Sequence, residues 1–193
     1  MTPYYNKATQ KGLIDHFTMV AQETTLPVIM YNVPSRTGTN IQPKTAVEIA
    51  KRNRNVIGIK DAAANLAQTG YTMHLAREAG VTLDIYSGND DEVLPVLSVG
   101  GIGVISVLSN VMPRETHDMV YEYLHGDRQK AMDIQLGLLP LIKALFCEVN
   151  PIPVKTALNL MGKNVGPLRM PLCDMDPQNL ALLKSEMHKV GLI

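Results

Sequence analysis

The sequence has no tryptophan, only two phenylalanines and two cysteines, and no excess of charge of either sign. Its 18 lysine and arginine residues equal its 18 aspartate and glutamate residues. Because nucleic acids and anionic membranes select strongly basic surfaces, this balance argues against both as partners. Cys147 and Cys173 stand far apart and form no C-x-x-C pair. Two such thiols are typical of a cytoplasmic protein without disulfides.

Long apolar runs are also lacking. The longest, at 138–146, is far shorter than the ~20 residues that span a bilayer, and it contains Lys143. The N-terminus shows no apolar segment behind a basic one and does not resemble a signal peptide. The five histidines show no H-E-x-x-H or similar spacing, so we expect no metal. With 46% hydrophobic residues, the chain has enough apolar material for a sizeable core.

What the sequence does have is a regular alternation of short β-rich runs and helical patterns. We predict strands at 27–33, 56–60, 83–87 and 102–107. We predict helices at 11–23, from Pro43, from Asn65 to Gly80, at 91–98 and from Pro113 to Gly126. Three further helices follow without strands, at 127–148, at 153–161 and from Asp176. Apolar strands separated by helices indicate a parallel sheet covered by helices.

A sheet of this kind belongs either to a (β/α)8 barrel or to a Rossmann-like fold. The Rossmann alternative needs a glycine-rich phosphate loop, and the segment 101–106 lacks the third glycine and lies within a predicted strand. A TIM barrel has eight strands and ~250 residues, and only four strands are predicted here. We therefore predict the α/β class, with about four βα units of a (β/α)8 TIM-barrel family over 1–126 and a C-terminal helical region over 127–193. A small open sheet is the alternative.

Catalytic groups of parallel α/β folds gather where strands end. Lys60 closes an otherwise apolar strand. It could simply reach solvent, or burial could lower its pKa from about 10.4 and make its amine a nucleophile that forms a Schiff base with a ketone. Tyr31 ends the neighbouring strand and could relay protons, although it could also be an ordinary buried aromatic residue. Arg36 follows in a Pro-Ser-Arg-Thr-Gly loop, where it could bind a substrate carboxylate or lie on the surface.

Several motifs carry a resemblance to a known family. Y-N-V-P-S-R-T-G at 31–38 followed by G-I-K-D at 58–61 resembles the paired signature of the dihydrodipicolinate synthase and N-acetylneuraminate lyase superfamily. Further segments resemble other motifs of the family and occur in the same order as in the family. They are P-Y-Y-N at 3–6, S-G-N-D at 87–90, G-G-I-G-V-I-S at 100–106 and N-P-I-P-V-K at 150–155. The resemblance covers essentially the whole chain.

The resemblance implies a role for each site residue. Lys60 would form the Schiff base with pyruvate, Tyr31 would relay protons, and Arg36 would bind the carboxylate of aspartate semialdehyde. Tyr5 would reach across a tight dimer into the neighbour's site. The activity implied is that of 4-hydroxy-tetrahydrodipicolinate synthase, a lyase of lysine and diaminopimelate biosynthesis.

The resemblance also implies the surroundings of that site. Gly88 and Ile105 would line the pyruvate pocket, largely through backbone groups, and Tyr4 would lie by the interface where lysine inhibits some members. No cofactor is expected beyond the covalent adduct of Lys60 with pyruvate. The expected partner is a further copy of the chain, since the family usually forms dimers of dimers.

Three alternatives stay open. A lyase of the N-acetylneuraminate type would keep the Schiff base and change the aldehyde, although Arg36 counts against it. A catalytically silent fragment or structural module is the second, because the family's first four strands and its Gly-Thr-Thr-Gly-Glu-type loop are missing from these 193 residues. The third is that another chain supplies these strands. We therefore expect impaired activity from this chain alone. We also expect the isolated half barrel to be unstable or to self-associate through unpaired strand edges, one of them at 27–33.

Overall fold

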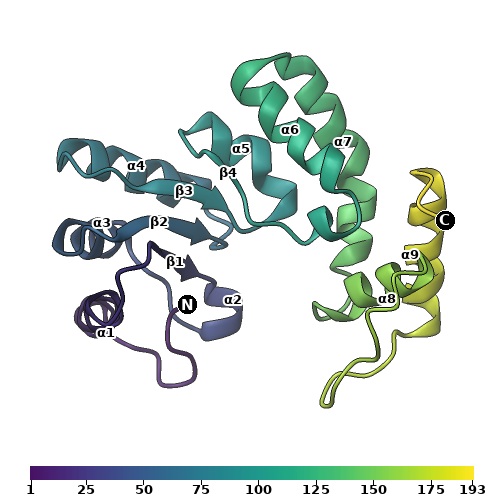
Figure 1. Cartoon of the computed structure of the whole chain (residues 1–193), viewed down its shortest axis with the longest axis horizontal. Helices are drawn as coiled ribbons and strands as arrows, with labels where there is room; N and C mark the ends of the chain where they lie inside the picture. Colours follow the sequence, from purple (N-terminus) through teal and green to yellow (C-terminus); the bar gives the residue numbers. More distant parts are fainter. The chain divides into compact units, whose positions relative to one another are not determined.

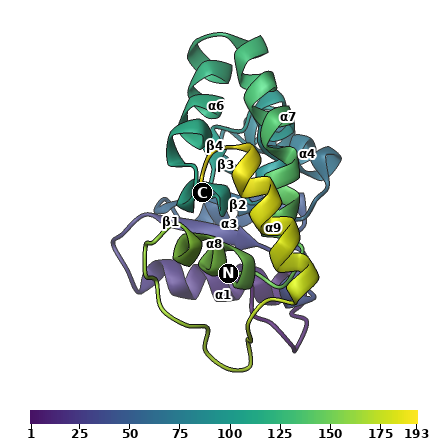
Figure 2. The same ribbon diagram turned by 90° about the vertical axis from the view of Figure 1, so that its right-hand side faces the viewer.

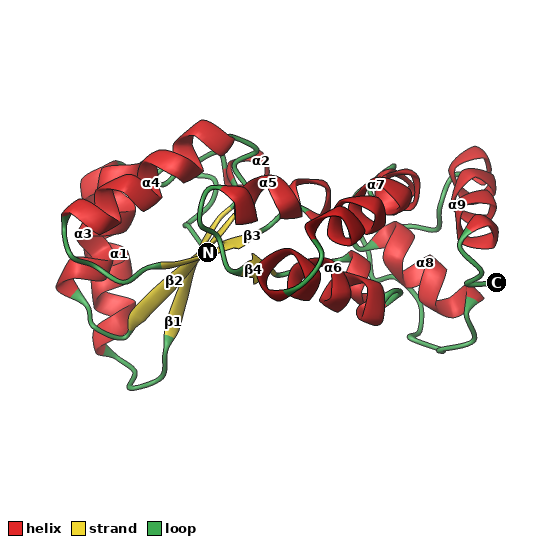
Figure 3. Cartoon of the chain, turned by 90° about the horizontal axis from the view of Figure 1, so that it is seen from above, coloured by secondary structure: helices red, strands yellow, loops and turns green.

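The computed structural model describes residues 1–193, and its backbone contacts divide them into two compact units, Met1–Ile105 and Ser106–Ile193. The first unit holds all the strands, and the second consists of helices and loops (Figures 1 and 3). None of the helices in either unit combines the length and the apolar character that crossing a membrane would require.

Strands and helices alternate through the first unit. Its elements are α1 (Gln10–Gln22), β1 (Val28–Asn32), α2 (Pro34–Thr37), α3 (Pro43–Arg52), β2 (Val56–Asp61), α4 (Leu66–Glu78), β3 (Asp84–Ser87), the 3-10 turn η1 (Asp90–Glu92), α5 (Val93–Ser98) and β4 (Gly103–Val104). The strands are parallel in the order β1-β2-β3-β4, so each strand pairs with the next one along the chain and β1 is an edge strand, as expected (Figure 1).

The core of this unit lies on one face of the sheet. Met30, Ile59 and Ile85, one residue from each of three strands, are almost fully buried. They pack in one cluster with helix residues such as Leu13 and Ile49. Since neighbouring residues of a strand point to opposite faces, the residues between them lie on the face that these helices leave uncovered.

Local signals explain where the helices of this unit begin. Pro43 stands at the first turn of α3, where its missing N–H costs nothing. The side chain of Asn65 caps α4 by accepting a hydrogen bond from the backbone N–H of Gln68. Both starts agree with the predictions from the sequence.

The fourth strand is shorter than predicted. Only Gly103–Val104 pair as β4, although the N–H of Ile102 still donates to Ile85 O at 2.9 Å and that of Ile105 to Ser87 O at 3.0 Å. At Ser106 the chain turns, and the Ser106 hydroxyl accepts a hydrogen bond from the N–H of Ser109 at 2.8 Å. This side-chain bond competes with the sheet and ends the strand.

The second unit contains the 3-10 turn η2 (Leu108–Asn110), α6 (Pro113–His125), α7 (Arg128–Leu145), α8 (Ile152–Leu160) and α9 (Pro177–Lys189). Helix α6 packs on α7, and α9 packs on α7 and α8 (Figure 2). The apolar faces of α7 and α9 meet through residues such as Leu141, Leu145, Leu183 and Met187, all of which are buried. On α6 the buried apolar residue is Met119, whereas Leu124 is exposed.

The packing units divide earlier in the chain than the boundary at 126/127 that the count of βα units suggested. Helix α6 follows the last strand, so it completes the fourth βα unit in the sequence, yet it packs chiefly on α7. The boundary at 126/127 separates the four βα units from the C-terminal helices in the sequence, not the two packing units. It stays a prediction.

Candidate active site

Three side chains form a row across the uncovered face of the sheet. The parallel register pairs Tyr31 with Lys60 and Lys60 with Tyr86, so one residue from each of β1, β2 and β3 lies at the same level. The Nζ atom of Lys60 lies 4.4 Å from the centre of the Tyr31 ring. The structure therefore brings together a lysine and a tyrosine that stand far apart in the sequence.

Burial pushes both of these groups toward their neutral forms. Partial burial lowers the pKa of Lys60, and the charge of Asp90 acts in the opposite direction by raising that pKa. Burial likewise raises the pKa of Tyr31, opposed by the nearby charge of Arg36. A neutral amine can attack an electrophile, and a neutral phenol can donate a proton.

A buried polar pair lies behind this row. Asn32 and Asp61 directly follow Tyr31 and Lys60 in their strands, so their side chains point to the opposite, helix-covered face, where they are 0% and 8% exposed. Asn32 Nδ2 donates to Asp61 Oδ1 at 3.1 Å. The hydroxyl of Thr69 on α4 donates to the other carboxylate oxygen of Asp61 at 2.9 Å. These bonds fix the ends of β1 and β2 against each other.

The pair is the centre of a larger network. Asn32 also donates to Asn40 Oδ1 at 2.9 Å and accepts from the backbone N–H of Ile41 at 2.9 Å. Asn40 in turn donates to Gln68 Oε1 at 2.7 Å. Buried polar groups are costly unless they are paired, so this chain of bonds holds one geometry of the strand ends. The sequence reasoning missed the network, although polar residues in apolar strands were a visible signal for it.

The loop predicted around Arg36 is a single helical turn, α2. Pro34 occupies the first position of the turn, and Gly38 ends it with a φ of 66°. That left-handed conformation favours glycine, and the N–H of Gly38 donates to Pro34 O at 2.8 Å. The turn carries the exposed Arg36 close enough to Tyr31 for its charge to influence the tyrosine's pKa.

The two N-terminal tyrosines lie outside the row. The segment that carries them is anchored at Thr2, whose N–H donates to Tyr31 O at 3.2 Å and whose hydroxyl donates to Thr37 at 3.0 Å. Beyond that anchor, Tyr4 is 66% and Tyr5 is 89% exposed. Both side chains are therefore largely exposed within this chain.

Gly88 and Ile105 lie beyond the ends of β3 and β4, and their amides are already in use. The N–H of Gly88 donates to Asp61 O at 2.7 Å, and that of Ile105 donates to Ser87 O at 3.0 Å. A Cβ atom on Gly88 would lie 2.6 Å from the Cβ of Ala62, so only glycine fits there. A ligand could therefore meet their carbonyl oxygens, not their N–H groups.

Two residues of the site region were not predicted. Tyr86 completes the row, and its ring lies beside Gly58 and Gly103 of the two neighbouring strands, where an added Cβ atom would be in ordinary contact with it at 3.5 Å. Asp90 is 2% exposed and acts on Lys60. Alternation along β3 could have assigned Tyr86 to this face, but its level beside Lys60 depends on the register. No group of three or more histidine, cysteine, aspartate or glutamate side chains could hold a metal ion.

The protein is therefore of the parallel α/β class, with a partly buried lysine and a tyrosine in register near the ends of neighbouring strands. The chain belongs to the dihydrodipicolinate synthetase family, whose model matches residues 1–189. It is 56% identical over 193 residues to the 4-hydroxy-tetrahydrodipicolinate synthase of Lachnoclostridium phytofermentans, and 54% identical over 193 residues to that of Clostridium tetani. Each alignment covers 100% of this chain and 65% of the relative, so the chain spans less than two thirds of their length.

Solved structures are similar over the same extent. The dihydrodipicolinate synthase of Thermotoga maritima matches with a TM-score of 0.96 and 44% identity, covering 100% of this chain and 65% of that one. A protein described as the first monomeric dihydrodipicolinate synthase variant matches with a TM-score of 0.96 and 44% identity, covering 100% of this chain and 64% of that one. The predicted fold class, four βα units of the (β/α)8-barrel family followed by three helices, is thereby confirmed.

Proposed function

We propose that this chain carries the Schiff-base site of a 4-hydroxy-tetrahydrodipicolinate synthase, a lyase that condenses pyruvate with aspartate semialdehyde. The observation that carries the proposal is the Lys60–Tyr31 pair, in which a lysine with a lowered pKa lies 4.4 Å from a tyrosine ring. Similarity to proteins of that name over 100% of this chain supports the choice of substrates.

Lys60 would supply the nucleophile. Its neutral amine attacks the ketone carbon of pyruvate, and the resulting carbinolamine loses one water to give an iminium ion. The iminium withdraws electrons, so the adjacent methyl carbon loses a proton and becomes an enamine. The enamine carbon then forms the new bond to the aldehyde carbon, whose oxygen takes up a proton. The bond to the aldehyde regenerates the iminium, and the amine of the aspartate semialdehyde part then attacks the iminium carbon. This attack closes the ring of the product and displaces the amine of Lys60, which is thereby restored.

Tyr31 would move the protons of these steps. Its raised pKa keeps the phenol protonated at neutral pH, so the hydroxyl can donate to the carbinolamine oxygen as it leaves. Arg36, exposed on α2 beside Tyr31, would bind the carboxylate of the aldehyde substrate with its planar fork. Gly88 and Ile105 would border the pyruvate through their carbonyl oxygens.

Another copy of the chain would complete the site. The 89% exposure of Tyr5 suits a ring that enters a neighbour's site, where it would extend the proton relay. Tyr4, exposed beside it, would lie at the same interface, where lysine would act as an inhibitor. The proposed assembly is therefore a homo-oligomer, a dimer of dimers.

Trapping with borohydride tests the proposal. The chain is incubated with pyruvate, reduced, digested and examined by mass spectrometry, and we expect one reduced pyruvyl group on the peptide that contains Lys60. A second arm adds aspartate semialdehyde and measures turnover, with N-acetylmannosamine as the competing aldehyde. An adduct without turnover of either aldehyde would favour a silent module, and the absence of any adduct from folded protein would overturn the Schiff-base proposal.

We predict that Asp90→Asn moves the pH profile of adduct formation to lower pH. The negative charge of Asp90 raises the pKa of Lys60, so its removal lets that pKa fall further and supplies neutral amine at lower pH. Adduct is allowed to form for a fixed time at each pH and is then reduced at one common pH. Asp91→Asn, at the exposed neighbouring position, is the matched control and should leave the profile in place. A shift toward higher pH would contradict the role of Asp90.

A further inference from the structure

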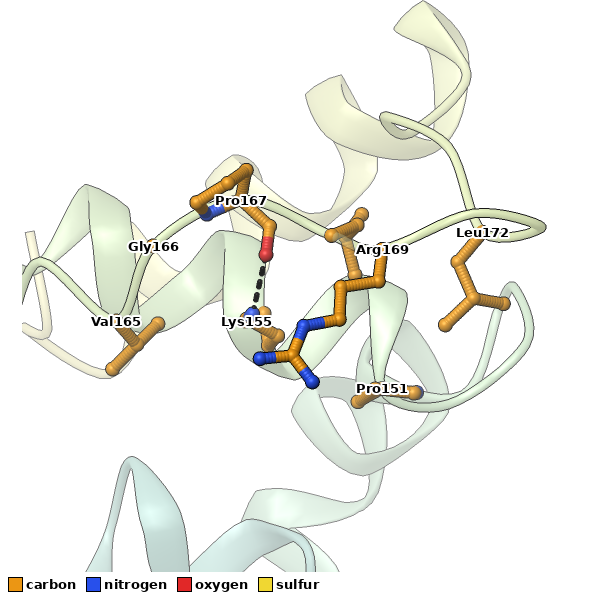
Figure 4. A pocket seen from close by; sticks show the side chains of 8 residues that line it. Pro151, Lys155, Val165, Gly166, Pro167, Arg169 and Leu172 are labelled. Atoms are coloured by element: carbon orange, nitrogen blue, oxygen red, sulfur yellow. Dashed lines mark hydrogen bonds between the residues drawn. The ribbon is translucent and has the colours of Figure 1, made fainter.

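A pocket of about 490 Å³ opens in the second unit between α8 and the segment that follows it (Figure 4). Its volume falls within the range of roughly 300–1,000 Å³ that is typical of small-molecule sites. Most of its wall is apolar, with Pro151, Val165 and Leu172 among the residues that line it. Lys155 and Arg169 are its only charged residues.

The wall opposite the helix is held in place by three hydrogen bonds. Asn159 donates from Nδ2 to Gly166 O at 3.2 Å, and its Oδ1 accepts from the N–H of Val165 at 2.9 Å. One helical turn earlier, Lys155 Nζ donates to Pro167 O at 2.6 Å. Residues four apart share a helix face, so α8 fixes the segment at two successive turns and the pocket is formed before any ligand arrives.

The charge in this pocket is not balanced. Lys155 uses one of its three N–H groups on Pro167, and the guanidinium of Arg169 makes no hydrogen bond or ion pair within the chain. Figure 4 shows the guanidinium directed toward the ammonium group of Lys155. No acidic residue lines the pocket. Two converging cations repel each other, so an anion placed between them would be attracted by both.

We propose that this pocket binds a small organic carboxylate. The planar fork of Arg169 matches the two oxygens of a carboxylate, and Lys155 has donors left for one of them. The apolar wall formed by Pro151, Val165 and Leu172 would cover a short carbon chain attached to the carboxylate. Inorganic phosphate, which is hydrated on every side, gains nothing from that wall. The site uses none of the residues of the proposed Schiff-base site.

Amide NMR titration of the whole chain tests this proposal. The probes are acetate, isobutyrate and inorganic phosphate at matched ionic strength. We expect saturable shifts at Gly166, Leu168 and Arg169, with isobutyrate binding more tightly than acetate. Arg169→Gln should weaken isobutyrate binding about tenfold or more, because it removes a charge-assisted bidentate contact. Lys163→Gln is the matched control, since Lys163 is exposed in the same segment and does not line the pocket.

Three outcomes would overturn the proposal. The first is no saturable shift, and the second is phosphate binding at least as tightly as isobutyrate, which would show a site for charge alone. The third is a shift of the same amides on dilution without added anion, which would show that a second copy of the chain covers the pocket. Lys60→Met should bind isobutyrate as the wild type does, so the result is independent of the Schiff-base proposal.

Discussion

Lys60→Met should abolish the pyruvyl adduct while leaving the fold intact. Methionine has a similar length and no amine, so the nucleophile is lost without a large change of volume. The measurement is the yield of reduced adduct by intact mass, together with the thermal midpoint of each protein. Lys51→Met, on the exposed side of α3, is the matched control and should keep the full yield. An equal yield from Lys60→Met would place the Schiff base on another lysine.

The same variant has an expected signature in stability. Burial makes the pKa of Lys60 lower in the folded chain than its ordinary value of 10.5, so folding disfavours the charged ammonium. The wild type therefore gains stability as pH rises through the folded pKa toward 10.5, because the unfolded chain binds more protons in that window. Lys60→Met lacks this contribution, and at neutral pH we expect it to be no less stable than the wild type.

Asp61→Ala should cost about 2–4 kcal/mol of the free energy of unfolding. The substitution leaves the hydroxyl of Thr69, the N–H of Ala63 and one N–H of Asn32 without the acceptor that they share, all in or near the buried network. Urea unfolding followed by circular dichroism measures the loss. Asp61→Asn, which keeps one acceptor oxygen, should cost roughly half as much.

A surface aspartate provides the control for this prediction. Asp15 is exposed on α1, so Asp15→Ala should change stability by no more than about 0.5 kcal/mol. If Asp61→Ala cost no more than Asp15→Ala, the network would not hold the strand ends. Because Lys60 directly precedes Asp61 in β2, we also expect slower adduct formation in folded Asp61→Ala, by about tenfold or more, since small displacements of reacting groups have large effects on rate.

The order of elements could be predicted because it depends on local patterns. Apolar runs gave the strands, and Pro43 and Asn65 marked helix starts through their own backbone chemistry. The predicted element boundaries were wrong where two local signals compete for the same residues. The turn at Ser106 shortened the fourth strand, and a proline followed four residues later by Gly38 closed a helical turn where a loop was predicted.

By itself, the sequence determined the parallel βα class, the placing of Lys60 and Tyr31 at strand ends, and the motifs of the family, because each depends on residues close together in the chain. The tertiary structure decided what depends on the pairing of distant segments. The register set Tyr31, Lys60 and Tyr86 at one level. Packing buried Asn32 against Asp61, and the fold of the segment after α8 brought Arg169 toward Lys155. Periodicity assigns a side chain to a face, but only strand pairing and helix packing determine which residue lies opposite it.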